Sequence, residues 1–342
     1  MVAIRNIALV LVCGTLIVAG AGYWWAQKTL QQPLVMPAAL MSTDEPALIE
    51  IPAGSHLRSV LQLLHEQGYL QGSVQHAYYA LRVFTPSDSI QAGVYAIEPN
   101  SSLTQFWSQV TAGRAHLFQV TLIEGHTWSQ WVEVLRRAPY LEHSLLELSE
   151  AHILGELGLA EYARLEGLLL PETYTYKAYT SATTVLRKAA AAMETQLAEL
   201  WANRDRDLPY ATPYELLIMA SIIEKETGIK AERARVSSVF VNRLRLGMRL
   251  QSDPTTIYGI ENFNGNLTRA HLRAETPYNT YRIPALPPTP IAMPSTASLV
   301  AAANPETTDY LYFVADGSGG HVFSRTLTEH NRAVNRYQRG IN

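Results

Sequence analysis

An uninterrupted apolar run in the second half of the chain ends in two carboxylates. Residues 216–223 contain no charged side chain, and Glu224, Lys225 and Glu226 follow them directly. A helix that is apolar on every side has no face for solvent, so it must lie inside a domain. The run therefore predicts a buried helix that carries Glu224 to the edge of a core.

The helical period separates the two acids. Glu224 stacks over Ala220 and Ser221, whereas Glu226 points about 200° away and can meet Lys230 four residues later. Because burial penalises the charged form, we expect apolar walls to raise the pKa of Glu224, and we expect Glu226 to be a solvated ion-pair partner. Glu224 is the candidate general acid, and a capping or ion-pair role is the alternative for a glutamate at a helix end.

A series of motifs accompanies this helix in a fixed order. They occupy residues 166–167, 171–174, 221–227, 239–259, 278–281, 286–288, 310–317 and 320–323. The series resembles the endolytic murein transglycosylases of the YceG-like family, and the resemblance extends over nearly the whole chain. It implies that the first glutamate of the Glu-Lys-Glu triplet, Glu224, is the essential catalytic residue.

The resemblance also implies a reaction, the lytic cleavage of peptidoglycan glycan strands. Glu224 would protonate the glycosidic oxygen that leaves N-acetylmuramic acid, and the acetamido group of the sugar would shield the oxocarbenium-like centre. The ionised Glu224 would then take the proton of the C6 hydroxyl, which closes a 1,6-anhydro ring without water. A lysozyme-like hydrolase with Asp253 or Glu275 as second carboxylate stays open, since the residues do not reveal the nucleophile.

Candidate substrate-binding residues come from the same motifs. Aromatic rings stack on pyranose faces, and amides bond hydroxyl and acetamido groups, although a packed core position is the alternative for each tyrosine. The candidates are Glu166, Gln251, Asp253, Tyr258, Asn279 and Tyr281.

The N-terminal segment reads as a membrane anchor. Residues 7–26 carry no charge and have about the length that crosses a bilayer, with Arg5 before them and aromatic residues 23–25 at the far end. We expect residues 1–27 to anchor a single-pass protein in the bacterial inner (plasma) membrane, with its C-terminal part in the periplasm. A cleaved signal peptide is the alternative, because residues 19–21 have the small-x-small form.

The rest of the chain divides into a linker and two folded parts of an α+β protein. Prolines mark a linker at residues 28–47, and a weak repeat of strand, turn and helix fills residues 48–140. These units resemble LysM-like glycan-binding modules, which the family has here, although Trp107, Trp128 and Trp131 have the spacing of core residues. Residues 141–342 are the expected mixed α/β catalytic domain. A non-catalytic glycan-binding scaffold is the alternative function.

Composition excludes several other functions. A net charge of -3 and the lack of a Lys/Arg run argue against nucleic-acid binding, and the ten histidines do not have metal-ligand spacing. We expect no metal and no cofactor. The expected partners are peptidoglycan strands and, through residues 7–26, the membrane. The family resemblance suggests peptidoglycan polymerases and the elongation complex as further partners, with a role in terminating nascent strands.

Overall fold

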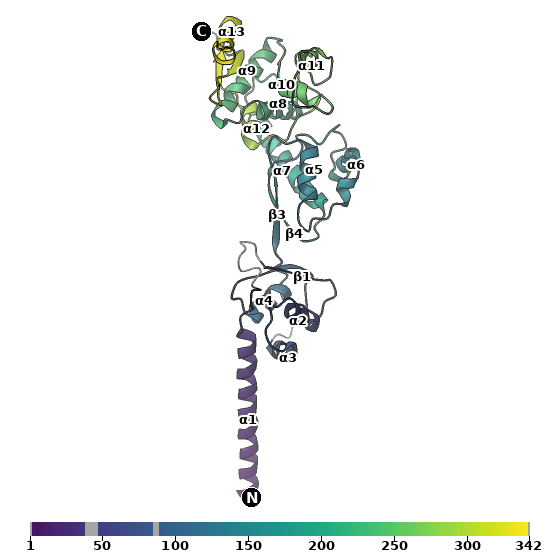
Figure 1. Ribbon diagram of the computed structural model, residues 1–342, viewed down its shortest axis with the longest axis vertical. Coiled ribbons are helices and arrows are strands. Elements are labelled where there is room, and N and C mark those ends of the chain that lie inside the picture. The colour runs from purple at the N-terminus through teal and green to yellow at the C-terminus, as the bar shows by residue number, and fades with distance from the viewer. Residues whose placement is uncertain (1, 38–46, 85–88, 341–342) are drawn as a thin grey trace. The chain divides into compact units, whose positions relative to one another are not determined.

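The computed structural model describes residues 2–37, 47–84 and 89–340, which form two compact units (Figure 1). The first unit contains residues 1–118 and 176–179, and the second contains residues 119–175 and 180–342. Helices predominate, and the sheets found in the described residues have two strands each. This mixed composition agrees with the predicted α+β class. Residues 38–46 of the predicted linker lie outside the described residues.

The first unit starts with helix α1 (Val2–Gln31). By length and apolar composition alone, residues 9–31 could cross a membrane. The rest of the chain buries almost none of this stretch. The end of α1 packs on α3 (Val74–Phe84) and α4 (Leu103–Thr111). An apolar helix therefore precedes the folded part of this unit.

The core of the first unit lies between a small sheet and three helices. Strand β1 (Ala47–Ile51) pairs antiparallel with β2 (Gly93–Ile97), and α2 (Leu57–Glu66), α3 and α4 contribute buried side chains to the same core. Capping boxes at His56 and Ser102 start α2 and α4. Trp107 is buried in this core, so it is a packing residue and not a sugar platform.

The boundary between the units differs from the predicted one at residue 140. Strand β3 (Leu117–Leu122), the third predicted strand of the repeat, pairs with β4 (Glu172–Lys177) and not with β1 or β2. Because that partner comes from a later part of the chain, the division falls at residue 118, and α5 (Trp128–Arg136) belongs to the second unit. Trp128 and Trp131 are buried there.

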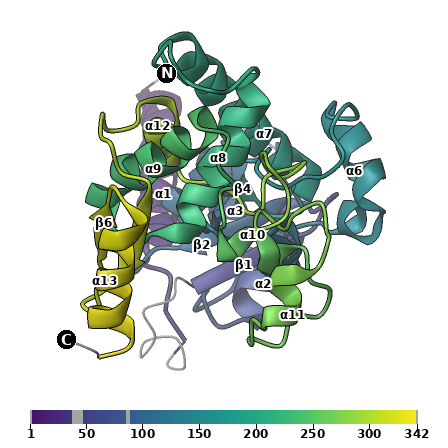
Figure 2. The same ribbon diagram turned by 90° about the horizontal axis from the view of Figure 1, so that it is seen from above.

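Helix α8 (Pro213–Glu226) is the centre of the second unit, and residues 216–223 are buried as predicted. It contacts α7 (Ala182–Ala202), α9 (Arg233–Arg245), α10 (Asp253–Tyr258) and α12 (Thr296–Ala303), and Figure 2 shows α7, α9 and α12 around it. The end of α8 is therefore the place where several segments meet.

Smaller elements complete the second unit. Strands β5 (Tyr312–Ala315) and β6 (His321–Ser324) form an antiparallel hairpin, and Asp316 closes its turn by accepting hydrogen bonds from the amides of Ser318 and Gly320. Residues 316–320 are thus the turn of this hairpin. The other elements are η1 (Ser144–Glu147), α6 (Glu150–Leu157), η2 (Lys230–Glu232), α11 (Arg269–Arg273) and α13 (Leu327–Gln338).

Candidate active site

Glu224 lies in a closed polar clamp at the end of α8. One carboxylate oxygen accepts a hydrogen bond from Arg233 Nη2 at 3.1 Å. The other accepts from the Ser295 amide at 2.9 Å, the Ser295 hydroxyl at 2.5 Å and the Ser298 hydroxyl at 2.7 Å. The side chains of Arg233 and Glu224 are only 7% and 5% exposed. The predicted apolar walls around Glu224 are therefore wrong.

The clamp has a clear structural use. Ser295 is the N-cap of α12, so Glu224 places its charge at the N-terminus of that helix, where a negative charge is favourable. Arg233 starts α9, so the same carboxylate also joins α8 to α9. All four of these contacts donate to the Glu224 carboxylate, and together they fasten three helices.

Glu226, two residues later, faces a different environment. Its carboxyl accepts a hydrogen bond of 2.5 Å from the Ser252 hydroxyl. The pKa of Glu226 is raised to about 7, chiefly by burial and also by the nearby charge of Asp253, while the Ser252 hydrogen bond and the charge of Arg243 oppose the shift. Among the described residues, Glu226 forms no ion pair with Lys230. The prediction of a solvated Glu226 is wrong, because the segment before α10 covers the last turn of α8.

Glu226 opens onto a cavity of about 480 Å³. Three of the predicted substrate-binding residues line the same cavity, and the Tyr281 hydroxyl donates a hydrogen bond of 2.7 Å to Asp253. Burial and this contact raise the pKa of Tyr281. The polar and aromatic lining residues are Glu226, Arg243, Gln251, Asp253, Tyr281, Tyr312, Phe313, His321, His330 and Gln338.

Arg243 fastens the loop that carries Gln251. Its guanidinium donates to the carbonyls of Leu311 at 2.6 Å and Leu250 at 2.7 Å, and to the side-chain oxygen of Gln251 at 3.3 Å. Gln251 has φ of 53°, a left-handed conformation that is uncommon for a residue other than glycine. Such backbone strain persists where the surroundings enforce it, and the Arg243 contacts do so here.

A carboxylate also orients His321 beside the cavity. Glu232 accepts from the His321 amide at 3.0 Å and lies 2.8 Å from Nδ1, so the ring proton is on Nδ1. Gly320 allows this approach, because a Cβ there would lie 3.1 Å from the same carboxylate. Arg243 and His321 were not among the candidates predicted from the sequence, although both belong to the motifs at residues 239–259 and 320–323.

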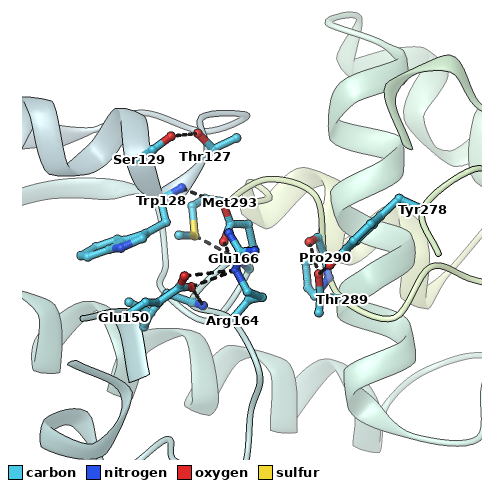
Figure 3. Close-up of polar contacts among 12 residues, drawn as sticks. Thr127, Trp128, Ser129, Glu150, Arg164, Glu166, Tyr278, Thr289, Pro290 and Met293 are labelled. Carbon is cyan, nitrogen blue, oxygen red and sulfur yellow. Dashed lines mark hydrogen bonds and ion pairs between the residues drawn. The ribbon is translucent and has the colours of Figure 1, made fainter. Parts of the chain in front are cut away.

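Glu166 does not line the cavity. Figure 3 shows it between Trp128 and Arg164: its carboxyl accepts from the Trp128 amide at 3.2 Å and lies 4.0 Å from Arg164 Nε. It is 2% exposed, and burial raises its pKa. Burial, and then the charge of Glu166, raises the pKa of the hydroxyl of the half-buried Tyr258, so the two side chains lie near each other. Neither residue lines the cavity beside Glu226.

Asn279 is fully buried, and its amide is saturated by the protein. Its oxygen accepts from Thr256 Oγ1 and from the Tyr281 amide, and its nitrogen donates to three carbonyls, the shortest contact being 2.6 Å to Ala274. Asn279 therefore shapes the loop that presents Tyr281. In the described ranges, no group of three or more His, Cys, Asp or Glu side chains is placed to hold a metal ion.

The motifs that build this cavity can be compared with those of known proteins. The model of the YceG-like family matches residues 49–336, and the chain belongs to this family. The family predicted from the sequence motifs is thus confirmed.

Named relatives and a solved structure agree with this assignment. The chain is 30% identical over 311 residues to an endolytic murein transglycosylase of Bacillus subtilis (strain 168), covering 84% of each chain. Proteins of the same name from two Streptococcus pneumoniae strains are 26% identical over 93% of this chain, which spans 62% of their length. A crystal structure of a YceG-like protein from Listeria monocytogenes shares 28% identity and a TM-score of 0.52, over 85% of this chain and 99% of that one.

Proposed function

We propose that this chain is a peptidoglycan lytic transglycosylase, which cleaves the bond between N-acetylmuramic acid and N-acetylglucosamine within glycan strands and leaves 1,6-anhydro ends. The name of the Bacillus relative supports the activity. The observation that carries the proposal is Glu226, an acid with a pKa of about 7 that lines a cavity with Asp253 and Tyr281. A group with this pKa can donate a proton near neutral pH and take one back.

The proposed reaction uses Glu226 twice. Its proton passes to the glycosidic oxygen as the bond from C1 to that oxygen breaks, and the bonding electrons leave with the oxygen. The C6 oxygen of the same muramoyl residue then bonds to C1, and its proton returns to Glu226. The acid is regenerated and no water is consumed. Gln251, Asp253 and Tyr281, which share the cavity, would bind the sugar.

We assign the acid role to Glu226, whereas the family resemblance implied Glu224. The reason is access: four donors from Arg233, Ser295 and Ser298 surround the Glu224 carboxylate, which is only 5% exposed. A glycosidic oxygen would have to displace one of them. Glu224 stays the alternative acid, and the cleavage rates of Glu226→Gln and Glu224→Gln distinguish the two.

A lysozyme-like hydrolase is the second candidate, because Asp253 lines the same cavity as Glu226. In that reaction one carboxyl donates a proton, and the other activates water or attacks C1. Mass spectrometry of the products of uncrosslinked glycan strands separates the candidates. We expect muramoyl ends lighter by one water than reducing ends. Reducing ends would establish a hydrolase, and cleavage by neither wild type nor Glu226→Gln would favour the non-catalytic scaffold.

We also infer that residues 7–26 anchor the protein in the inner membrane as a single span, with the two units in the periplasm, where the first unit would act as a LysM-like glycan-binding module. The support is the length and apolar composition of α1. Cleavage near the membrane would terminate nascent strands beside the polymerases and the elongation complex. Retention of the intact N-terminus in the membrane fraction, and longer glycan strands in cells lacking the protein, are the expected results. A mature protein that starts after residue 21 would instead indicate a signal peptide.

A further inference from the structure

Helix α3 crosses the end of α1 within the first unit. The rings of Tyr23 and Phe84 meet edge to face with centroids 5.1 Å apart, and those of Trp25 and His76 meet at 5.2 Å. Both contacts join the aromatic residues at the end of the apolar segment to opposite ends of α3. The two contacts therefore determine where α3 lies along the length of α1.

The two contacts fix the level of α3 along α1. Tyr23 and Trp25 differ by about 3 Å of rise along α1, whereas His76 and Phe84 are separated by about 12 Å along α3, at 1.5 Å per residue. Both ends of α3 are therefore held to the same short stretch of α1. If α1 crosses a membrane, α3 lies at the level of Tyr23 and Trp25.

One side of α3 is buried and the other carries exposed apolar groups. Ala77 and Leu81 face the core, while Tyr79, two residues from each and thus about 200° round the helix, is 51% exposed. Val83, four residues after Tyr79 on the same side, is 72% exposed. Gln75, His76 and Arg82 are also exposed on this side, so the outer face of α3 combines apolar groups with polar and basic ones.

The same surface continues on α1. Trp24, between the two residues that hold α3, is 66% exposed, and Tyr23 is also largely exposed. Tyrosine and tryptophan are the residues enriched where a membrane meets water, because their rings are apolar and carry one polar end. A helix whose outer face carries apolar and aromatic groups beside basic ones can lie in this zone, with the apolar groups towards the acyl chains and the basic groups at the headgroups.

We propose that α3 is an interfacial helix that lies in the outer headgroup layer of the membrane, with Tyr79 and Val83 in contact with lipid. The inference rests on the proposed anchoring by residues 7–26. With α1 as a spanning helix and α3 as a second contact, the first unit cannot swing freely about its anchor. It is held against the bilayer surface.

Depth-dependent fluorescence quenching tests this placement in the full chain, reconstituted in vesicles of phosphatidylglycerol and phosphatidylethanolamine. Cys13→Ser removes the only cysteine, and single cysteines at positions 79 and 83 carry an environment-sensitive dye. Leu11→Cys in the apolar run is the control for a deep position. Gln62→Cys, on an exposed position of α2, is the control for water.

We expect dyes at 79 and 83 to be quenched by lipids labelled near the headgroup and to be protected from aqueous iodide relative to the dye at 62. Equal iodide quenching at 62, 79 and 83, with the dye at 11 quenched by deeply labelled lipid, would overturn the interfacial helix while leaving the anchor intact. If lipid labels did not quench the dye at 11 either, the anchor itself would be refuted, and the interfacial helix with it. Val83→Asp, with the dye at 79, should weaken quenching by lipid.

Discussion

The Ser252 hydroxyl donates a hydrogen bond of 2.5 Å to the Glu226 carboxyl, and this contact fastens the last turn of α8 to the N-cap of α10. It stabilises the charged form of Glu226, whereas burial and the charge of Asp253 stabilise the neutral form. The balance, a pKa of about 7, lets one residue act as acid and then as base.

The dependence of the rate on pH should report this balance. Because the acid must carry its proton, we expect cleavage to decline as pH rises through about 7. Ser252→Ala removes a contact that lowers the pKa, so the decline should move to higher pH. Asp253→Asn removes a charge that raises it, so the decline should move to lower pH. Arg243, His321 and His330, which also line the cavity, are common to all three proteins. Shifts in the same direction would contradict the account.

The same shift predicts an effect on stability. The folded pKa of Glu226, about 7, exceeds the ordinary value of 4.5, so the stability that the neutral form gives is complete below 4.5 and is lost as pH rises through 7. The cost at pH 8 is of the order of 3 kcal/mol. We therefore expect Glu226→Gln to raise the melting temperature above that of wild type at pH 8, and much less at pH 4.5. The exposed Glu275→Gln is the control and should change neither.

The clamp around Glu224 predicts strong coupling with Arg233. Removing one partner of a buried ion pair costs about 3–5 kcal/mol, because the other charge stays buried. We expect Glu224→Gln and Arg233→Met each to destabilise by this order in urea unfolding, and the double variant to cost clearly less than their sum. The matched control is the half-exposed pair of Arg235 and Glu306, where Arg235→Met should cost about 1 kcal/mol or less. Additive losses at Glu224 and Arg233 would argue against the clamp.

Asn279 should affect stability and not substrate binding. Asn279→Ala leaves several buried partners without a hydrogen bond, including the carbonyl of Ala274 and the amide of Tyr281. We expect a loss of about 2–4 kcal/mol in urea unfolding, with an unchanged KM for the molecules that remain folded. The exposed Asn264→Ala should be neutral. A raised KM at full stability would restore Asn279 as a sugar ligand.

Local pattern was enough to predict individual elements of this fold. The apolar run at residues 216–223 predicted a buried helix, and α8 is that helix. The pairing of β3 with β4 was not predictable in the same way, because about 50 residues separate the strands and the repeat pattern favoured an earlier partner.

The site was harder to predict for a related reason. A helical wheel gives the angle between the side chains of Glu224 and Glu226, but it does not show which residues of other segments surround each of them. Ser295 and Ser252, which decide the two environments, come from 71 and 26 residues away in the chain. Among the six predicted substrate-binding residues, Gln251, Asp253 and Tyr281 line the cavity with Glu226. Glu166, Tyr258 and Asn279 do not line it.

The most direct test is the cleavage rate of the full-length protein on uncrosslinked strands, with Glu226→Gln and Glu224→Gln compared at equal amounts of folded protein. Loss of a general acid typically costs about 10²–10⁴ in rate. We predict a loss of this size for Glu226→Gln, while the folded fraction of Glu224→Gln keeps turning over. A folded but inactive Glu224→Gln beside a fully active Glu226→Gln would contradict the account and return the acid role to Glu224.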